Sequence, residues 1–221
     1  MDRKLVAVLA VSSLAYSLMV AGVFYLAGTI RLPFFWAVYG FQAILGLICV
    51  MVLDPDLMRE RIRPGGKDQD PTTPPLLTLL YVLRYATAAL DVGKFHISTI
   101  PTAVQVIAFL LMVAGWAGLI WSMKVNYFFS SAIRLQADRG QKVISSGPYA
   151  YIRHPGYAFA TVVFICECLA LGSWLALIPT LPMVLILIKR TFMEEQMLDS
   201  DLEGYADYKK KVRYRWIPRI W

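Results

Sequence analysis

Long apolar segments constrain this chain more than any other feature of its sequence. About 20 mostly apolar residues in a helix cross the hydrocarbon core of a bilayer. Apolar residues make up 58% of the 221 residues and charged residues only 17%. A soluble domain of this length cannot bury such an apolar excess. The composition therefore argues against a soluble globular enzyme and against a disordered chain, and it favours an integral membrane protein.

The apolar segments predict an all-α polytopic membrane bundle of about six transmembrane helices. The third segment is the weakest because it contains Arg84, so five spans are the alternative. Gly172 and Ser173 predict a tight turn that makes the last two segments a helical hairpin. The first segment is longer than the apolar part of a signal peptide, so we expect an uncleaved first helix. The expected spans are residues 5–27, 33–53, 76–92, 101–123, 157–171 and 174–188.

The distribution of basic residues predicts the orientation of these spans. The chain has 22 Lys and Arg and a net charge of +7. With six spans, nearly all of them fall on the side of the two termini, and the opposite side receives only Arg31 and Lys94. Positive residues face the cytoplasm, so we expect both termini there. In a membrane protein this charge favours anionic lipid as the partner, and we expect no nucleic acid and no obligate protein partner.

The first cluster of chemically interesting residues is GPYAYIRHPGY, residues 147–157. Pro155 suits the first turn of the helix that follows. Arg153 and His154 then lie at the amino end of that helix, at the membrane surface. Free N–H groups and the helix dipole favour an anion there. The alternative is an ordinary interfacial helix start with a snorkelling arginine and anchoring tyrosines.

The second cluster is KRTFMEEQML, residues 189–198, which continues the last span into the cytoplasm. Arg190 and Glu194 are four residues apart on one helix face, so we expect them to pair. Glu195 lies about 100° further round and can point elsewhere. A donor and acceptor site for a charged ligand is one interpretation. A solvated helix end with one ion pair is the other.

Two ionisable residues fall at membrane depth, since Arg84 and Glu167 both lie about 12–15 Å from the cytoplasmic end of their spans. A lone charge at that depth is costly. We therefore expect a buried ion pair that locks the third span to the fifth, and the alternative is that one of the two points into an acceptor cavity. With two histidines and no clustered carboxylates in the spans, we expect no catalytic metal site.

Two long connections are expected on the cytoplasmic side of the membrane. Residues 59–75 are rich in Pro and Gly and predict a mobile loop. In residues 124–146, apolar side chains are expected to enter the membrane interface while Arg134 and Arg139 face headgroups. This second segment is either a lid over a ligand or a plain amphipathic connector.

Taken together, the motifs resemble one known family. The run GPYAYIRHPGY, a short hairpin, RTFMEEQ and then EGYADYKKKVRYRWIP are similar to the integral membrane methyltransferases. That family includes isoprenylcysteine carboxyl methyltransferases and phospholipid N-methyltransferases. The resemblance covers residues 126–221, and DPDLMRERIRP and LDVGKFHIS look like pieces of prokaryotic members. It therefore implies a prokaryotic cell membrane and an active site on the cytoplasmic side.

The resemblance implies S-adenosylmethionine as the cofactor and S-adenosylhomocysteine as its product. It divides the chain into a four-span region, residues 1–123, and a cofactor-binding catalytic region, residues 124–221. Arg190, Glu194 and His154 would be catalytic. Arginine at a helix amino end suits the cofactor carboxylate, glutamate suits its ammonium or ribose, and aromatic rings suit the adenine and sulfonium. The implied cofactor-binding residues are Gly147, Pro148, Tyr149, Arg153, His154, Pro155, Tyr157, Glu194, Glu195 and Tyr208.

The activity implied is methyl transfer to a lipophilic acceptor at the cytoplasmic interface. An isoprenylcysteine-like carboxylate needs no base. A phospholipid amine must first lose a proton, and His154 and Glu194 are the candidate bases. A small-thiol S-methyltransferase of the same fold, or a membrane transporter or scaffold without enzymatic activity, are the alternatives.

Overall fold

The structure is a computed structural model that describes the backbone of residues 3–221 and the side chains of residues 11–221. Within this range the regular elements are helices, and no strand is present. The α-helices are α1 (Arg3–Ala27), α2 (Pro33–Val52), α3 (Pro55–Ile62), α4 (Thr73–Ala89), α5 (Thr102–Val125), α6 (Pro155–Ala170), α7 (Leu177–Asp201) and α8 (Tyr205–Lys211). A π-helical turn, Leu90–Phe95, follows α4, and short 3-10 turns lie at Ala137–Arg139 and Gly147–Ala150.

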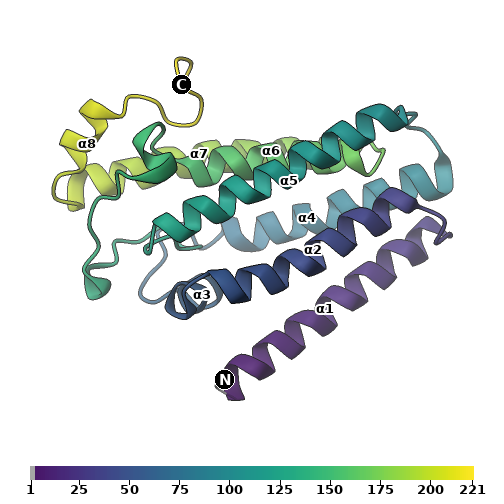
Figure 1. The fold of residues 1–221 in the computed structure, drawn as a ribbon, viewed down its shortest axis with the longest axis horizontal. Coiled ribbons are helices and arrows are strands. Elements are labelled where there is room, and N and C mark those ends of the chain that lie inside the picture. The colour runs from purple at the N-terminus through teal and green to yellow at the C-terminus, as the bar shows by residue number, and fades with distance from the viewer. Residues whose placement is uncertain (1–2) are drawn as a thin grey trace.

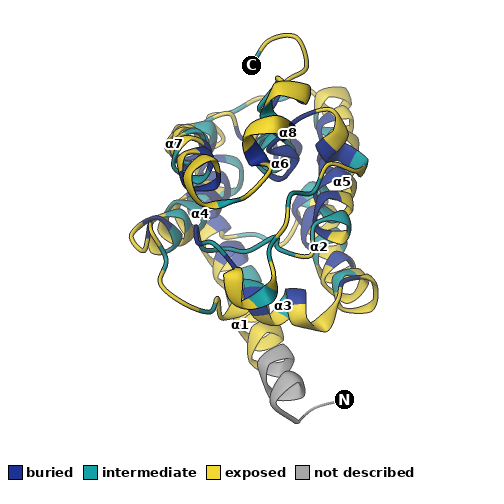
Figure 2. Ribbon diagram, turned by 90° about the vertical axis from the view of Figure 1, so that its left-hand side faces the viewer, coloured by how far each residue is buried: buried dark blue, intermediate teal, exposed yellow. Residues whose placement is uncertain are grey.

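The long helices run up and down beside one another, as Figure 1 shows. The short helices α3 and α8, the connector between α5 and α6, and the C-terminal tail gather at one end of the bundle. Seen from that end, the buried positions of the helices turn inward and the exposed positions turn outward (Figure 2). The polar elements therefore form a cap on one end of an apolar bundle.

Within the part of the chain whose side chains the structure describes, three helices are long and apolar enough to cross a membrane: Pro33–Val52, Thr73–Phe95 and Thr102–Val125. The apolar stretches Val11–Ala27 and Pro155–Ala170 are shorter. These helices agree with the predicted all-α membrane protein. Six spans, and a cytoplasmic location of both termini, stay predictions.

The expected ion pair at membrane depth is present. Arg84 Nη2 lies 2.6 Å from Glu167 Oε2, and the two side chains are 0% and 1% exposed. Tyr85, beside Arg84 on α4, and Gln42 on α2 also donate hydrogen bonds to the Glu167 carboxylate. Glu167 therefore ties α6 to both α4 and α2, and its role here is structural.

The expected mobile loop is partly wrong, because residues 59–62 belong to α3. Asp54 caps this helix, and its side chain accepts hydrogen bonds from the amides of Asp56 and Leu57. Pro55 occupies the first helical turn. The Asp54-Pro55 pair thus follows the end of α2 and also starts α3.

The hairpin of α6 and α7 is present, with the turn at Gly172 in the left-handed region at φ +85°. On the other side of α6, α5 packs so closely that a Cβ on Gly118 would lie 2.5 Å from the Phe159 ring. This contact fixes α6 against α5 and so places the start of α6 beside the connector.

Candidate active site

The amino end of α6 is covered by the C-terminal tail. The amide of Arg153 donates to the carbonyl of Tyr214, and the amide of His154 to that of Arg215, both at 2.9 Å. Further along the tail, Trp216 Nε1 donates to Thr191 Oγ1 on α7 at 2.9 Å. The tail therefore joins the start of α6 to α7. Its carbonyls also accept hydrogen bonds from the amides of Arg153 and His154, which were expected to be free to bind an anion.

Glu195 is the centre of a buried ion-pair cluster. Arg153 contacts its carboxylate through Nε and Nη2, both at 2.6 Å, Arg215 Nε lies 2.8 Å away and His154 Nε2 3.3 Å away. Burial alone would raise the pKa of Glu195, but the hydrogen bonds from His154, Arg153 and Arg215 hold it well below its ordinary value. Glu195 is thus a charged anchor between α6, α7 and the tail, and its oxygens are occupied by the protein itself.

Arg153 is largely engaged within the protein as well. Its Nη1 donates to the carbonyl of Val212 at 2.8 Å, in addition to the two contacts with Glu195. A guanidinium has five N–H donors, and these contacts account for three. Arg153 therefore keeps a limited capacity for a ligand, whereas the sequence predicted a freely available cation.

A pocket with a cavity volume of about 100 Å³, open to solvent on one side, lies between the start of α6, the C-terminal part of α7, α8 and the connector. Residues of both sequence clusters line it, together with residues of the connector and of α8. Six of the residues that the sequence predicted for the cofactor line it: Tyr149, Arg153, His154, Tyr157, Glu194 and Tyr208.

His154 and Glu194 meet at this pocket, as the sequence required of a common site. His154 Nδ1 lies 3.8 Å from Glu194 Oε2, and the Glu194 side chain is 33% exposed. Among the described residues, His154 is the one ion-pair neighbour of Glu194. The ring of Tyr157 stacks on His154 at 5.9 Å between centroids. The wall thus presents an open carboxylate beside an imidazole and an aromatic face.

The expected pair between Arg190 and Glu194 is wrong. Arg190 Nη2 donates to the carbonyl of Ser131 at 2.8 Å, and Nη1 lies 3.8 Å from Asp70 Oδ2. Asp70 comes from the loop before α4 and also binds Lys189 at 3.2 Å. Arg190 therefore pairs with the distant carboxylate of Asp70 and not with Glu194 on its own helix. Nη1 of Arg190 is buried without a hydrogen-bond partner among the described residues.

Gly147, Pro148 and Pro155 shape the site from outside the pocket lining. Gly147 adopts φ +58°, and a Cβ there would lie 2.9 Å from Val125. Pro148 and Pro155 are buried. They fix the turn that delivers Tyr149 and His154 to the pocket, so we assign them to support of the backbone.

The connector between α5 and α6 supplies a wall of the pocket that the sequence left open. Phe128, Phe129 and Gln136 line it, and Asn126 donates to the hydroxyl of Tyr149 at 3.2 Å. The expectation that Arg134 faces headgroups is wrong. Arg134 is buried and contacts Glu60 twice at 3.0 Å, as well as Asp138 at 2.7 Å.

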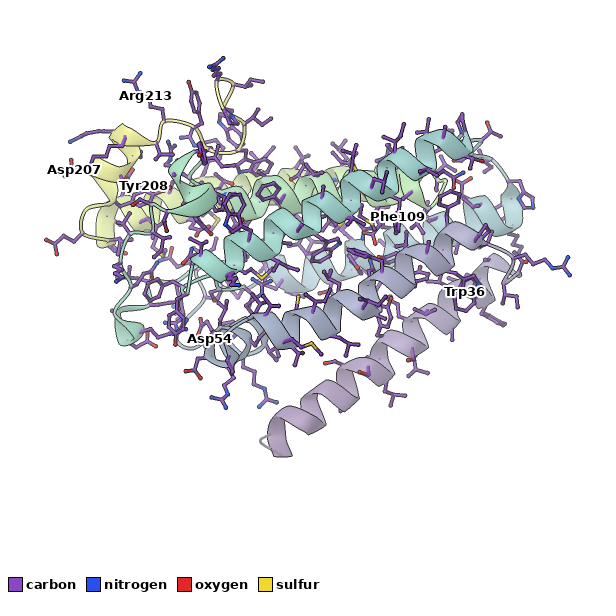
Figure 3. All side chains as sticks on the ribbon, viewed as in Figure 1. Trp36, Asp54, Phe109, Asp207, Tyr208 and Arg213 are labelled. Atoms are coloured by element: carbon purple, nitrogen blue, oxygen red, sulfur yellow. The ribbon has the colours of Figure 1, made fainter. Side chains whose placement is uncertain are left out.

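Helix α8 covers the pocket with two buried tyrosines. Tyr208 Oη donates to the carbonyl of Tyr149 at 2.7 Å, while the hydroxyl of Tyr205 is buried without a partner among the described residues. Burial raises the pKa of both Tyr205 and Tyr208, so their hydroxyls stay protonated as donors. In Figure 3, Asp207 and Arg213 project away from the body, and Tyr208 lies on the inner side of α8.

A comparison with curated proteins gives no significant match. Residues 103–203, from the start of α5 to the end of α7, match the model of the phospholipid methyltransferase family. The match contains both sequence clusters and confirms their resemblance to the membrane methyltransferases. Over residues 103–203 the chain is therefore similar to the phospholipid methyltransferase family.

Proposed function

We propose that this chain transfers a methyl group from S-adenosylmethionine to the amine of a membrane phospholipid. The family match supports a methyltransferase that acts on a lipid-like substrate. The pocket at the polar end of the bundle supports a site where a polar donor and a lipid meet. An amine is preferred to a carboxylate or a thiol because the matched family methylates phospholipids.

The residues of the pocket fit the methyl donor chemically. The half-buried Glu194 carboxylate suits the donor's ammonium or ribose hydroxyls. The buried hydroxyl of Tyr205, which has no partner among residues 11–221, offers a hydrogen bond to a ligand. Rings of Tyr149, Tyr157 and Phe129 suit the adenine and sulfonium. Glu195 supports this wall indirectly by holding Arg153, whose remaining N–H groups suit the donor's carboxylate.

When bound, the donor supplies an electrophilic methyl carbon, and the new N–C bond forms as the C–S bond breaks. The protein must hold the acceptor nitrogen in line with that bond, which is chiefly a matter of positioning. It must also accept the proton that the amine loses. His154 and Glu194 are the titratable pair at the pocket wall, and they accept it in this proposal. Arg190 is placed one turn away, where its buried Nη1 orients the acceptor side.

One observation carries the proposal: a histidine and an open glutamate from separate elements line one pocket beside aromatic rings. The test measures S-adenosylmethionine binding by calorimetry in dodecyl maltoside. It also measures transfer of a tritiated methyl group to phosphatidylethanolamine, N-acetyl-S-farnesylcysteine and a small thiol. We expect binding by the wild type, with phosphatidylethanolamine as the best acceptor.

Glu194→Gln should weaken binding of the donor roughly tenfold, since one charge-assisted contact is lost. Glu203→Gln is the matched control, because Glu203 is exposed outside the pocket lining. Unchanged affinity in Glu194→Gln, or no binding by the wild type, would reject this pocket as the donor site. Labelling of the farnesylcysteine alone would replace the amine acceptor by a carboxylate.

A further inference from the structure

Arg61 is an arginine near the pocket that has no counter-ion among residues 11–221. Arg134, Arg153 and Arg190 are each buried and each form an ion pair with a carboxylate. Arg61 belongs to α3, and among residues 11–221 its guanidinium forms no ion pair and donates no hydrogen bond. A half-buried cation without a counter-ion is costly, and a bound anion would remove that cost.

The side chain of Arg61 is directed toward the interior. Its guanidinium carbon lies 4.9 Å from the centroid of the Phe129 ring. Tyr149, Tyr157 and Cys49 are close enough to influence its pKa, which burial lowers. An arginine that merely snorkels would extend outward to the headgroup layer. Arg61 instead packs behind the aromatic wall of the pocket.

The connector holds Arg61 in this position. The Glu60 carboxylate accepts hydrogen bonds from Arg134 and from Ser130 Oγ, and the carbonyl of Arg61 accepts one from Ser131 Oγ at 2.9 Å. These two consecutive residues point to different surroundings, since Glu60 binds the connector and Arg61 faces the rings. The contacts of Glu60 thus fix the direction of the Arg61 side chain.

We propose that Arg61 binds the phosphodiester group of the phospholipid acceptor and thereby places its amine at the donor pocket. This inference rests on the proposed function and names the residue that recognises the acceptor. A guanidinium offers paired N–H donors that match phosphate oxygens. Arg134, Arg153 and Arg190 are already paired with carboxylates, whereas Arg61, which lies behind the aromatic wall of the pocket, has no such partner among residues 11–221.

The rings around Arg61 suit the other end of such a headgroup. Phe129, Tyr149 and Tyr157 line the donor pocket on one side and adjoin Arg61 on the other. An ethylene bridge separates the phosphate and the amine of an ethanolamine headgroup, so a phosphate on Arg61 sets the amine among these rings. Aromatic faces also attract an alkylated ammonium. The acyl chains then extend past the exposed apolar residues Met51 and Ile62, which are 82% and 47% exposed.

The test compares Arg61→Gln, Arg61→Lys and the control Arg59→Gln in purified full-length protein in detergent. Arg59 lies on the same helix but is exposed and pairs with Asp56 at the surface. The binding probes are dioctanoyl phosphatidylethanolamine, dioctanoyl phosphatidylglycerol, dioctanoylglycerol and N-acetyl-S-farnesylcysteine. Binding is measured by thermophoresis, the affinity for S-adenosylmethionine is measured separately, and KM is measured for the first probe.

We expect Arg61→Gln to weaken binding of both phospholipids at least roughly tenfold, as for loss of a charged hydrogen bond, and to raise KM with little change in kcat. Binding of dioctanoylglycerol and of the methyl donor should not change, Arg61→Lys should recover part of the affinity, and Arg59→Gln should match the wild type. Equal losses for the neutral and the phosphate lipids, or a loss limited to the farnesylcysteine, would overturn the inference. Because binding is measured without turnover, a wild type that binds phospholipid through Arg61 but methylates none would refute the proposed function alone.

Discussion

Glu194 and Glu195 are adjacent residues of the same type on one helix, but they have different surroundings and different roles. They lie about 100° apart on α7. Glu195 is 5% exposed and is surrounded by Arg153, Arg215 and His154, while Glu194 borders the pocket. Glu195 therefore holds the elements together, whereas the carboxylate of Glu194 stays accessible at the pocket.

Replacing Glu195 should therefore reduce stability more than replacing Glu194. In Glu195→Gln, the two arginines around the side chain lose their shared counter-ion, and breaking a buried pair costs about 3–5 kcal/mol. We expect a clear fall in Tm, followed by differential scanning fluorimetry in detergent. Glu194→Gln is the matched variant on the same helix and should stay near the wild-type Tm. Equal Tm values for the two variants would contradict the separate roles.

The sequence predicted which residues meet at the pocket better than it predicted their contacts. The position of His154 at a helix start and the spacing of Glu194 in the next motif were enough to bring both to one pocket. The commitment of Arg153 to Glu195 and Val212 was not predictable, because Val212 lies in a tail whose docking is a long-range event. Arg61 was hidden for the same reason, since its sequence neighbours suggested a mobile loop.

At the scale of helices, the apolar segments predicted the long helices. The short helix α3 and the π-helical turn, which polar residues hold in place, were harder to predict. Helices α2 and α5 match the expected spans closely. Residues 59–62 of α3 were expected in a loop because Pro and Gly follow them, whereas Asp54 caps this helix and Pro55 starts it. The π-helical turn Leu90–Phe95 has no simple sequence signature. Its Asp91 binds Ser98 and Ser173, which again depends on distant contacts.

The lock between α4 and α6 makes a prediction about paired substitutions. Arg84→Leu or Glu167→Leu alone leaves an uncompensated buried charge and should destabilise the bundle by about 3–5 kcal/mol. The double variant removes both charges and should recover most of the loss. Thermal unfolding in detergent provides the comparison, and donor affinity should persist in the double variant, since neither residue lines the pocket. Additive losses would show that the two residues do not act as a pair.

At the scale of the whole molecule, the apolar bundle and the polar cap are stabilised by different interactions. Among residues 11–221, the long helices are joined by one buried ion pair, by hydrogen bonds to Glu167 and by packing, whereas several ion pairs join the elements of the cap. The predicted division between residues 1–123 and 124–221 remains a proposal, and the matched family segment begins within α5. Orientation of the cap toward the cytoplasm likewise rests on the basic residues of the sequence.

The stability of the cap should fall at acidic pH, because three of its carboxylates must then be protonated. Burial raises the pKa of Glu60, Asp70 and Glu195, but their hydrogen bonds to arginine, lysine, threonine and histidine outweigh it, so each pKa lies below its ordinary value of 4.5 for Glu and 3.8 for Asp. A group whose pKa is lower in the folded state stabilises it above the unfolded pKa. That contribution is lost as the pH falls below about 4.5 and through the folded values.

We therefore expect Tm in a non-ionic detergent to be nearly constant from about pH 7 to pH 5 and to fall increasingly below about pH 4.5. Scanning fluorimetry at constant ionic strength measures this profile. Glu195→Gln should start from a lower Tm and lose less on acidification, because it lacks one of the groups that must be protonated. Asp207→Asn, an exposed change on α8, should follow the wild-type slope. A Tm that rises on acidification would show that the buried carboxylates are already protonated in the folded protein, and the ion pairs would then not be what holds the cap to the bundle.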